Sequence, residues 1–517
     1  MQDPQSLEDV DPSRVSLLEE GVEPGIWRYA KAERVSVIID AADYFAFMQQ
    51  AMLKAQNRIF LIGWDFDTRI HLATGRRWFE KGRNRTYPSR LGSFFVWLVR
   101  KRKTLEIKIL KWSFGAFKLV IRSSMWADLL RWWPHKRIDF KFDNAHPVGC
   151  SHHQKIVVLD NRLAACGGID MTVKRWDDRE HLPQNPNRTT PGGKIYDPWH
   201  DATMMMEGDI ADALAELGED RWTSAGGEAL KSIPVRSDSL WPEGLPVQFK
   251  NVEVGISRTR ACYREWDQVR EIEQLFIQHI ARAKRFIYAE SQYFASRVIG
   301  EAVLKRLEEA DPPEMVIVHP AHADGWLEQQ AMDHARAQLV RTIEAADYKN
   351  RFSLWTPFTG DTPIYVHAKI LIVDDEMFRI GSANMNNRSL GLDSECDVSI
   401  DCARQANGHC SPVIAGLRYS LLGEHCEVEQ EDVAALIEQA GSMQAFIEQA
   451  AKRSGVRRIL KRYHPPQLSQ MERTLAESAI LDPERPQDLF EPYVKGGLFR
   501  DGTRLKRVRD RVRRKQS

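Results

Sequence analysis

A pattern of His, Lys and Asp occurs twice in the sequence, at the same offsets each time. The two copies are His153, Lys155 and Asp160, and His367, Lys369 and Asp374. If the copies meet at one phosphate, a neutral imidazole can attack phosphorus while the other, protonated, gives its proton to the leaving oxygen. The two ammonium groups can offset charge in the five-coordinate transition state. The repeat therefore predicts a phosphodiesterase that works through a covalent phosphohistidine, without a metal or another cofactor.

The residues that follow each copy repeat as well. The first copy is followed by Gly167-Gly168-Ile169-Asp170 and the second by Gly381-Ser382-Ala383-Asn384, at equal distances from the two histidines. The hydroxyl of Ser382 and the amide of Asn384 can donate hydrogen bonds to phosphate oxygens. The candidates for binding the substrate phosphate are therefore Lys155, Lys369, Asp170, Ser382 and Asn384.

Strand geometry separates the roles within each copy. A His and a Lys two residues apart point to the same face of a strand, whereas an Asp at an odd offset points to the other face. Asp160-Asn161 and Asp374-Asp375 are typical of turns. Although Asp160 and Asp374 complete the catalytic pattern, we expect them to hold turns rather than to meet the substrate.

A nucleophilic imidazole usually needs a carboxylate on its other ring nitrogen, which fixes its tautomer and orientation. Within the half that carries His367, the candidate is Glu395. Within the half that carries His153, the candidate is Asp201, in the sequence Trp199-His200-Asp201. The catalytic set is completed by Asn384.

The same order of elements is predicted around both motifs. Asp40 is expected to cap the first helix, and a helix of the second passage is expected to include Trp266, Val269 and Ile272. Strands are expected at residues 59–62, 105–110, 138–142 and 153–159, and again at 286–289, 315–318, 352–354 and 366–373. Strands that alternate with helices favour a largely parallel sheet covered by helices. The shared order indicates an internal duplication.

The predicted fold class is α/β, with two similar sheet-plus-helix lobes and a helical, charged C-terminal extension. Within the extension, residues 431–440 and 442–451 are each predicted to form an amphipathic helix. Residues 226–250 are rich in Gly, Ser and Pro without clear periodicity, which is typical of a linker. The expected division is a polar N-terminal arm at 1–34, a first lobe at 35–225, the linker at 226–250, a second lobe at 251–428 and the extension at 429–517.

Composition limits which binding partners and which cellular compartment are expected. The net charge of the 517 residues is +1, so the whole molecule does not indicate a polyanionic partner. Seven irregularly spaced cysteines favour free thiols over disulfides. His409, Cys410, His425 and Cys426 lack a standard zinc spacing. The sequence predicts no signal peptide and no membrane span, so we expect a cytoplasmic or peripheral membrane protein, with signal-independent export left open.

These residues resemble the phospholipase D superfamily, whose signature is His-x-Lys-x4-Asp followed by a Gly-Ser/Gly-x-Asn/Asp stretch. The resemblance covers roughly residues 35–428 and is nearest to classical phospholipases D. It extends to Arg175-Trp176-Asp177-Asp178, His181, Trp199-His200-Asp201, Glu290-Ser291-Gln292-Tyr293-Phe294, Leu417-Arg418 and Glu424-His425. It implies a two-lobed fold with one active site at the lobe interface, His153 as nucleophile and His367 as general acid. Gly168 and Asp170 depart from the Ser and Asn of the second copy, so the halves are not equivalent.

The resemblance implies hydrolysis of the headgroup phosphodiester of glycerophospholipids to phosphatidic acid, or transphosphatidylation when an alcohol replaces water. A phosphatidyltransferase such as a cardiolipin synthase, a nuclease, and a catalytically silent lipid-binding scaffold remain alternatives. Tryptophans among basic residues at 97–137, and the basic segment 500–517, suit a phospholipid membrane surface. Nucleic acid is not an expected partner, and a monomer is expected.

Overall fold

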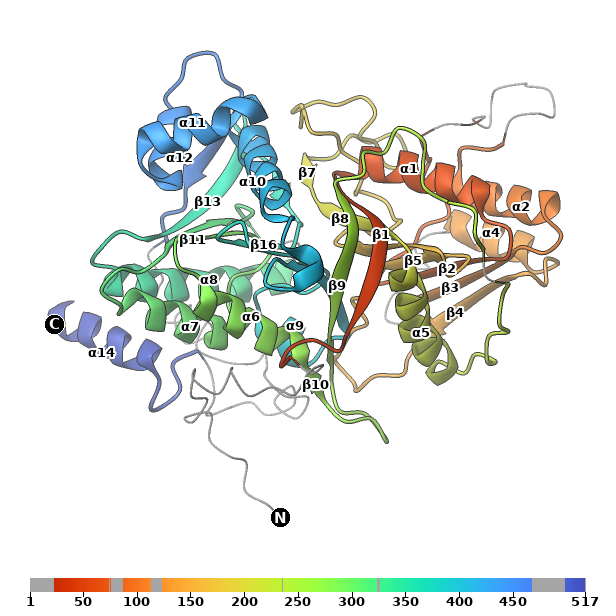
Figure 1. Ribbon diagram of the computed structural model, residues 1–517, viewed down its shortest axis with the longest axis horizontal. Coiled ribbons are helices and arrows are strands. Elements are labelled where there is room, and N and C mark those ends of the chain that lie inside the picture. The colour runs from red at the N-terminus through yellow and green to blue at the C-terminus, as the bar shows by residue number, and fades with distance from the viewer. Residues whose placement is uncertain are drawn as a thin grey trace.

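The chain folds into two α/β halves that lie side by side and share one ladder of paired strands (Figure 1). The computed structural model describes residues 23–73, 75, 87–112, 123–234, 236–322, 326–466 and 498–516. Side chains of a few residues at the ends of helices, Trp126 among them, lie outside this description.

The first half alternates strands with helices. Its strands are β1 (Arg28–Ile39), β2 (Arg58–Gly63), β3 (Glu106–Trp112), β4 (Ile138–Asp143), β5 (Ile156–Leu159), β6 (Leu163–Gly167), β7 (Trp199–His200) and β8 (Ala202–Glu207). Its helices are α1 (Ala41–Lys54), α2 (Leu91–Lys101), α4 (Ser123–Trp132) and α5 (Asp209–Ser224). Strand β1 begins inside the range assigned above to the N-terminal arm.

The second half repeats the alternation. Its strands are β9 (Phe249–Arg260), β10 (Val269–Arg270), β11 (Phe286–Glu290), β12 (Glu314–Val318), β13 (Phe352–Thr359), β14 (Thr362–Pro363), β15 (Tyr365–Val366), β16 (Ile370–Val373), β17 (Met377–Gly381) and β18 (Glu395–Asp401). Its helices are α6 (Glu271–Arg282), α7 (Arg297–Leu307), α8 (Trp326–Ala346), α9 (Asn387–Gly391) and α10 (Ser411–Cys426), with a 3-10 turn at Gln405–Asn407.

The order of strands is the same in both halves. The first sheet runs β1-β8-β6-β5-β2-β3-β4, and the second runs β9-β18-β17-β16-β11-β12-β13. Strands β1 and β9 pair antiparallel where the sheets meet. This matched order supports the internal duplication predicted from the sequence.

The prediction of a largely parallel sheet is wrong. Among the described strands, parallel pairing is confined to β2-β3-β4, β11-β12-β13 and the short pair β7-β15. The motif strands instead form antiparallel hairpins, β5 with β6 and β16 with β17. The Asp-Asn and Asp-Asp turns are the physical cause, because a short turn can only join antiparallel neighbours.

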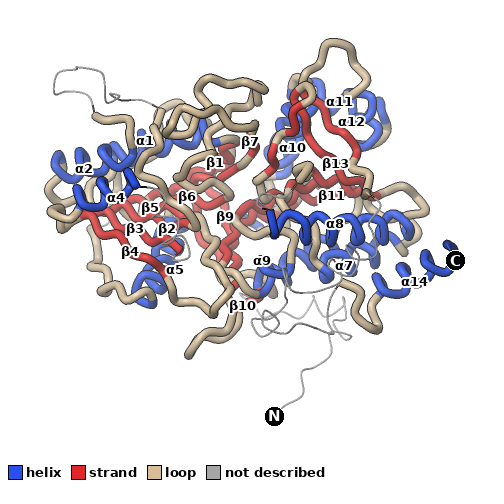
Figure 2. The backbone as a smooth tube through the Cα atoms, turned by 180° about the vertical axis from the view of Figure 1, so that it is seen from behind, coloured by secondary structure: helices blue, strands red, loops and turns tan. Residues whose placement is uncertain are grey.

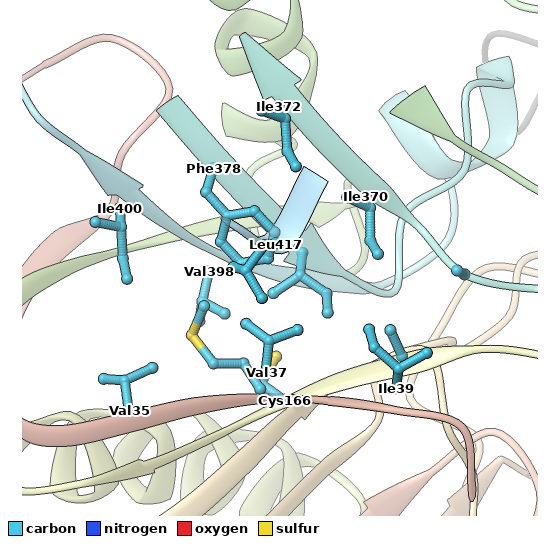
Figure 3. Close-up of a cluster of buried hydrophobic side chains, with 14 of the residues drawn as sticks. Val35, Val37, Ile39, Cys166, Ile370, Ile372, Phe378, Val398, Ile400 and Leu417 are labelled. Carbon is cyan, nitrogen blue, oxygen red and sulfur yellow. The ribbon is translucent and has the colours of Figure 1, made fainter. Parts of the chain in front are cut away.

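Both faces of each sheet are buried, which explains the continuous apolar runs of β5 and β16. The inner faces pack against one another, with β1 and β6 facing β16, β17 and β18 across a core closed by Leu417 of α10 (Figure 3). The outer face of the first sheet packs on α1 and α2, and that of the second packs on α6, α7 and α8 (Figure 2). The inner core fixes how the halves dock.

Three local predictions need correction. The helix of the second passage begins at Glu271, so Trp266 and Val269 precede it. Asp40 stands at the start of α1 but its side chain makes no capping hydrogen bond. The strands β5 and β16 begin at Ile156 and Ile370, so the motif His and Lys residues lie just before them.

The C-terminal extension is largely helical and is integrated into the second half. Helices α11 (Gln430–Ala440) and α12 (Met443–Ala450) fall where amphipathic helices are expected. Strand β19 (Arg458–Arg462) adds an edge to the second sheet by pairing with β13. The basic end forms α14 (Arg504–Gln516), where Leu505 is buried and its backbone N–H bonds Glu301 of α7.

Candidate active site

Each motif is tied to the opposite half of the chain by its backbone. The N–H of His153 donates to the carbonyl of Ser394 at 2.8 Å, and the N–H of His367 donates to the carbonyl of His200 at 2.7 Å. The second contact is continued by the parallel pairing of β7 with β15. The two motif segments are thereby held at the interface between the halves.

The carboxylates that orient the imidazoles also cross between the halves. Glu395 lies against Nδ1 of His153, at 3.0 and 3.1 Å from its two oxygens, and Asp201 lies 2.7 Å from Nδ1 of His367. Both predicted carboxylates contact an imidazole, but the assignment of each to the histidine of its own half is wrong. Because both contacts engage Nδ1, Nε2 is the ring atom left for chemistry on each histidine.

Gly168 makes room for one of these contacts. A Cβ atom at this position would lie 2.0 Å from Oδ1 of Asp201 and 3.3 Å from the carbonyl oxygen of His367. No side chain fits there without displacing the carboxylate. The departure from the Ser of the second copy therefore has a steric reason, which is the close approach of Asp201 to His367.

Four basic groups influence one another at the interface. Burial, followed by the charges of Lys155 and Lys369, holds the pKa of His153 well below its usual range. Burial and the charge of Lys369 do the same to the pKa of His367, with smaller contributions from Arg175, Lys155 and His153. Burial lowers the pKa of Lys369 to about 7. The histidines are therefore neutral in the free protein, and an anionic substrate would offset the cations that surround them.

The two lysines have different neighbours. The Lys155 ammonium donates to the carbonyl of His153 at 2.8 Å and lies 3.4 Å from Oδ2 of Asp170. The Lys369 ammonium donates to the carbonyl of His367 and to Oε1 of Gln292, the latter at 3.3 Å. Asp170 therefore forms an ion pair with Lys155. This contact differs from the predicted one, in which Asp170 binds the substrate phosphate.

The two polar residues of the second copy also differ in what they contact. The Ser382 hydroxyl donates to Oε2 of Glu395 at 2.5 Å, and Ser389 donates to Oε1 at 2.7 Å. The Ser382 hydroxyl was predicted to donate to the substrate phosphate. It donates to Glu395 instead, and this bond holds Glu395 against His153. Burial raises the pKa of Glu395 to about 8. Asn384 donates to Gln292 at 3.4 Å, while its own oxygen has no hydrogen-bond partner.

Asp160 and Asp374 contact backbone amides in equivalent ways. The carboxylate of Asp160 accepts three hydrogen bonds of 2.7 Å from the N–H groups of residues 56–58, at the start of β2. The carboxylate of Asp374 accepts three of 2.6 to 2.8 Å from residues 284–286, at the start of β11. Each Asp therefore fastens its hairpin to the neighbouring strand, in agreement with the turn-holding role expected from its offset.

Asp160→Asn and Asp374→Asn are expected to destabilise the fold while leaving the chemistry of folded protein nearly intact. Each change weakens charge-assisted hydrogen bonds, so the free energy of unfolding should fall by about 2 kcal/mol. Urea unfolding followed by circular dichroism measures this loss. Asp361→Asn, in the exposed turn between β13 and β14, is a matched control with an expected change under about 0.5 kcal/mol. Unchanged stability with lost turnover would instead place either carboxylate in the chemistry.

Gln292 and Arg175 were given no role in the sequence analysis, yet both lie in the site. Gln292 contacts both Lys369 and Asn384, and it donates to the hydroxyl of Tyr365 at 2.9 Å. Arg175 is 9% exposed and its guanidinium lies 4.3 Å from the centre of the Trp199 ring. Both residues belong to segments that resemble the phospholipase D superfamily, and this membership was the feature of the sequence that could have marked them as site residues.

Aromatic rings flank both histidines. The Trp199 ring lies 5.1 Å from that of His367 and stacks on Tyr365 at 4.6 Å between centres. The Trp64 ring lies 6.3 Å from that of His153 and stacks on Trp112 at 5.8 Å. These rings exclude water from the imidazoles, which strengthens the electrostatic interactions around them.

Comparisons with known proteins match this chain to phospholipase D-like families. Residues 276–410 match a family model described as a cardiolipin synthase, phospholipase D-like domain, and residues 352–476 match one described as phospholipase D. Phospholipase D A of Dictyostelium discoideum is 25% identical over 71% of this chain and 33% of its own length. Phospholipase D alpha 1 of Zea mays is 27% identical over 58% of this chain and 52% of its own length. The chain thus spans about a quarter to a half of the curated relatives it matches.

A solved structure shares the fold. The phosphatidylserine synthase of Haemophilus influenzae Rd KW20 superimposes with a TM-score of 0.51 at 12% identity, over 82% of this chain and 96% of that one. At this identity the likeness concerns the arrangement of the two halves and their sheets.

Proposed function

We propose that this chain, which belongs to the phospholipase D superfamily, hydrolyses the headgroup phosphodiester of glycerophospholipids to phosphatidic acid. The observation that carries the proposal is the pair of crossed contacts, His153 with Glu395 and His367 with Asp201. They hold two imidazoles at one interface between two lysines, so that one can attack phosphorus while the other, once protonated, gives its proton to the leaving oxygen.

In the first step, Nε2 of His153 attacks phosphorus and the bond from phosphorus to the headgroup oxygen breaks. His367 takes up a proton at Nε2 when the bound anionic substrate offsets the nearby cations, and it gives that proton to the headgroup oxygen, while Asp201 stabilises the imidazolium from which the proton leaves. Lys155 and Lys369 stabilise the charge on the non-bridging oxygens. The assignment of His153 as nucleophile follows the family resemblance.

In the second step, His367 accepts a proton from water, whose oxygen attacks phosphorus. The bond between phosphorus and His153 breaks, and phosphatidic acid leaves. An alcohol can take the place of water and would yield a phosphatidyl alcohol. A complete set of these groups lies in one chain, so we propose that a monomer is active.

Added ethanol should divert the reaction. Because water and ethanol compete for the same phosphoryl-enzyme, vesicles of mixed phospholipids should give phosphatidylethanol in proportion to ethanol, with headgroup release unchanged. Chromatography of the lipid products together with assays for free headgroup measures both. Phosphatidic acid alone at high ethanol would argue against the intermediate. Nicking of plasmid DNA without headgroup release would point to a nuclease instead.

A phosphatidyltransferase such as a cardiolipin synthase is the second candidate, because residues 276–410 match a model of that description. Its chemistry is the same up to the acceptor, which would be a second lipid alcohol. Formation of a dimeric phospholipid from phosphatidylglycerol in the absence of ethanol, at a rate above hydrolysis, would favour it.

A peripheral contact with the membrane is part of the proposal. Trp133 and Leu130 are 88% and 69% exposed at the end of α4, next to the exposed basic residues Arg131 and Lys136. Apolar and basic side chains together favour an anionic lipid surface. Trp132, by contrast, is buried in the core of the first half. No helix within the described residues has the length and apolar character to cross a membrane.

A further inference from the structure

We infer that a four-coordinate divalent metal ion of the zinc type binds between the halves, beside the active site and away from its reacting atoms. Four buried side chains supply the ligands: Asp40, His181 and His200 from the first half and Glu424 from α10 of the second. One ligand atom from each lies within 4.8 Å of the others.

The spacing of the ligand atoms fits a tetrahedral ion. Nε2 of His181 lies 3.4 Å from Oδ2 of Asp40 and 3.1 Å from Oε1 of Glu424. Nδ1 of His200 lies 2.9 Å from the same Glu424 oxygen, and one ligand atom from each of the four residues lies within 4.8 Å of the others. Zinc bonds to nitrogen and oxygen of about 2.0–2.1 Å give a tetrahedron with edges of about 3.3 Å. Six to eight oxygen ligands, as calcium prefers, would not fit this set.

Both histidines are held through the other ring nitrogen by a carboxylate, as metal-binding histidines usually are. Nδ1 of His181 lies 3.0 Å from Asp177, which is itself bonded by Arg188 at 2.8 Å. Nε2 of His200 lies 2.8 Å from Glu290. These partners direct Nε2 of His181 and Nδ1 of His200 towards the same point.

Two of the converging atoms have no hydrogen-bond partner. Oδ2 of Asp40 is one, in a side chain that is 1% exposed. Nδ1 of His200 is the other, although it lies 2.9 Å from Glu424. Nε2 of His181 does form a hydrogen bond with Oε1 of Glu424 at 3.1 Å, but this bond leaves the other two atoms unsatisfied, whereas a metal ion would satisfy all four atoms at once. The Asp40 side chain also fails to cap α1, which leaves it directed at this cluster.

The charges of the cluster leave room for one divalent cation. Four buried carboxylates, Asp40, Asp177, Glu290 and Glu424, surround the two histidines, and the buried Arg188 and the partly exposed Arg179 pair with two of them. The other two negative charges are balanced either by protons on His181 and His200 or by a divalent ion that replaces those protons.

The inferred ion would fix the backbone that carries the second catalytic pair. Oδ1 of Asp40 accepts a hydrogen bond of 3.1 Å from the N–H of Asp201, and the His200 carbonyl accepts one from His367. The ion would therefore join the halves and position Asp201 and His367, while the phosphoryl transfer itself proceeds on the histidines.

The test is the metal content of the full chain. After incubation with zinc chloride and removal of unbound ions, mass spectrometry of the wild-type protein should find about one zinc per chain. Asp40→Asn and His181→Ala should each lower that content at least about tenfold. His409→Ala removes an exposed imidazole beside Cys410 and should leave it unchanged. Cobalt in place of zinc should give the visible absorption of a four-coordinate site.

Chelation should also lower the melting temperature of the wild-type protein, by about 5 °C, and added zinc should restore it. Wild-type protein that keeps under about a tenth of a zinc per chain would overturn the inference, as would variants that are folded by circular dichroism and keep the wild-type content. If a variant does not fold, the zinc content of the wild-type protein alone decides whether the inference holds. None of these readouts needs a substrate, so their failure is separate from failure of the proposed phospholipase activity.

Discussion

His153→Ala and His367→Ala are each expected to lower kcat for headgroup release by at least about 10⁴-fold. The reason is that both imidazoles act in both steps: one forms and then releases the bond to phosphorus, and the other gives and then takes a proton. Release of choline, ethanolamine or glycerol from vesicles measures the loss. His322→Ala, which removes a largely exposed imidazole, is the matched control and should keep the wild-type rate. Either active-site variant with a near-normal rate would contradict a shared site.

An activated substrate separates the two roles. Nitrophenol leaves phosphorus without needing a proton, so phosphatidyl-p-nitrophenol should relieve the first step of its general acid. His367→Ala should then still release nitrophenol once per chain, in a rapid burst, and accumulate the phosphoryl-enzyme. His153→Ala should show no burst. The reverse pattern would make His367 the nucleophile.

Glu395→Gln and Asp201→Asn are expected to lower kcat for natural lipids by about 10² to 10⁴-fold, because each disturbs the tautomer and orientation of its imidazole, and Asp201→Asn also removes the counter-charge of the His367 imidazolium. The crossed contacts make the two losses differ on the nitrophenyl substrate. Glu395→Gln should slow the burst strongly, since Glu395 orients His153, whereas Asp201→Asn should affect mainly the steps after it.

If each carboxylate instead oriented the histidine of its own half, the nitrophenyl substrate would give the opposite result. Asp201→Asn would then slow the burst, and Glu395→Gln would spare it. Asp393→Asn is a control for changes near Glu395, because Asp393 bonds the backbone N–H of Ser151 and Arg388 rather than an imidazole. It should lower the burst rate by less than about tenfold.

Much of the fold followed from local patterns. The repeated order of strands and helices is visible in the sequence because apolar runs and turn residues report directly on backbone periodicity. The amphipathic helices of the extension fall within one residue of their expected start. Pairing direction was misjudged, since alternation of strands with helices does not show that the motif strands turn back as hairpins.

The extension shows a second limit of local reasoning. Its segment Arg458–Arg462 is short and has three basic residues in five, yet it pairs with β13 as an edge strand. Edge strands often carry basic side chains because one side of the strand remains unpaired. Such a strand is recognised only when the neighbouring sheet is in place.

By itself, the sequence determined the candidate groups for the chemistry: two histidines, two lysines and two further carboxylates, whose types and spacings are covalent facts of the chain. Only the tertiary structure decided which carboxylate serves which imidazole, and that Asp40, His181, His200 and Glu424 converge. The reason is physical: these contacts bring together residues as far apart in the sequence as Asp40 and Glu424, which are 384 positions apart, and they form only when the inner apolar faces of the two sheets pack together.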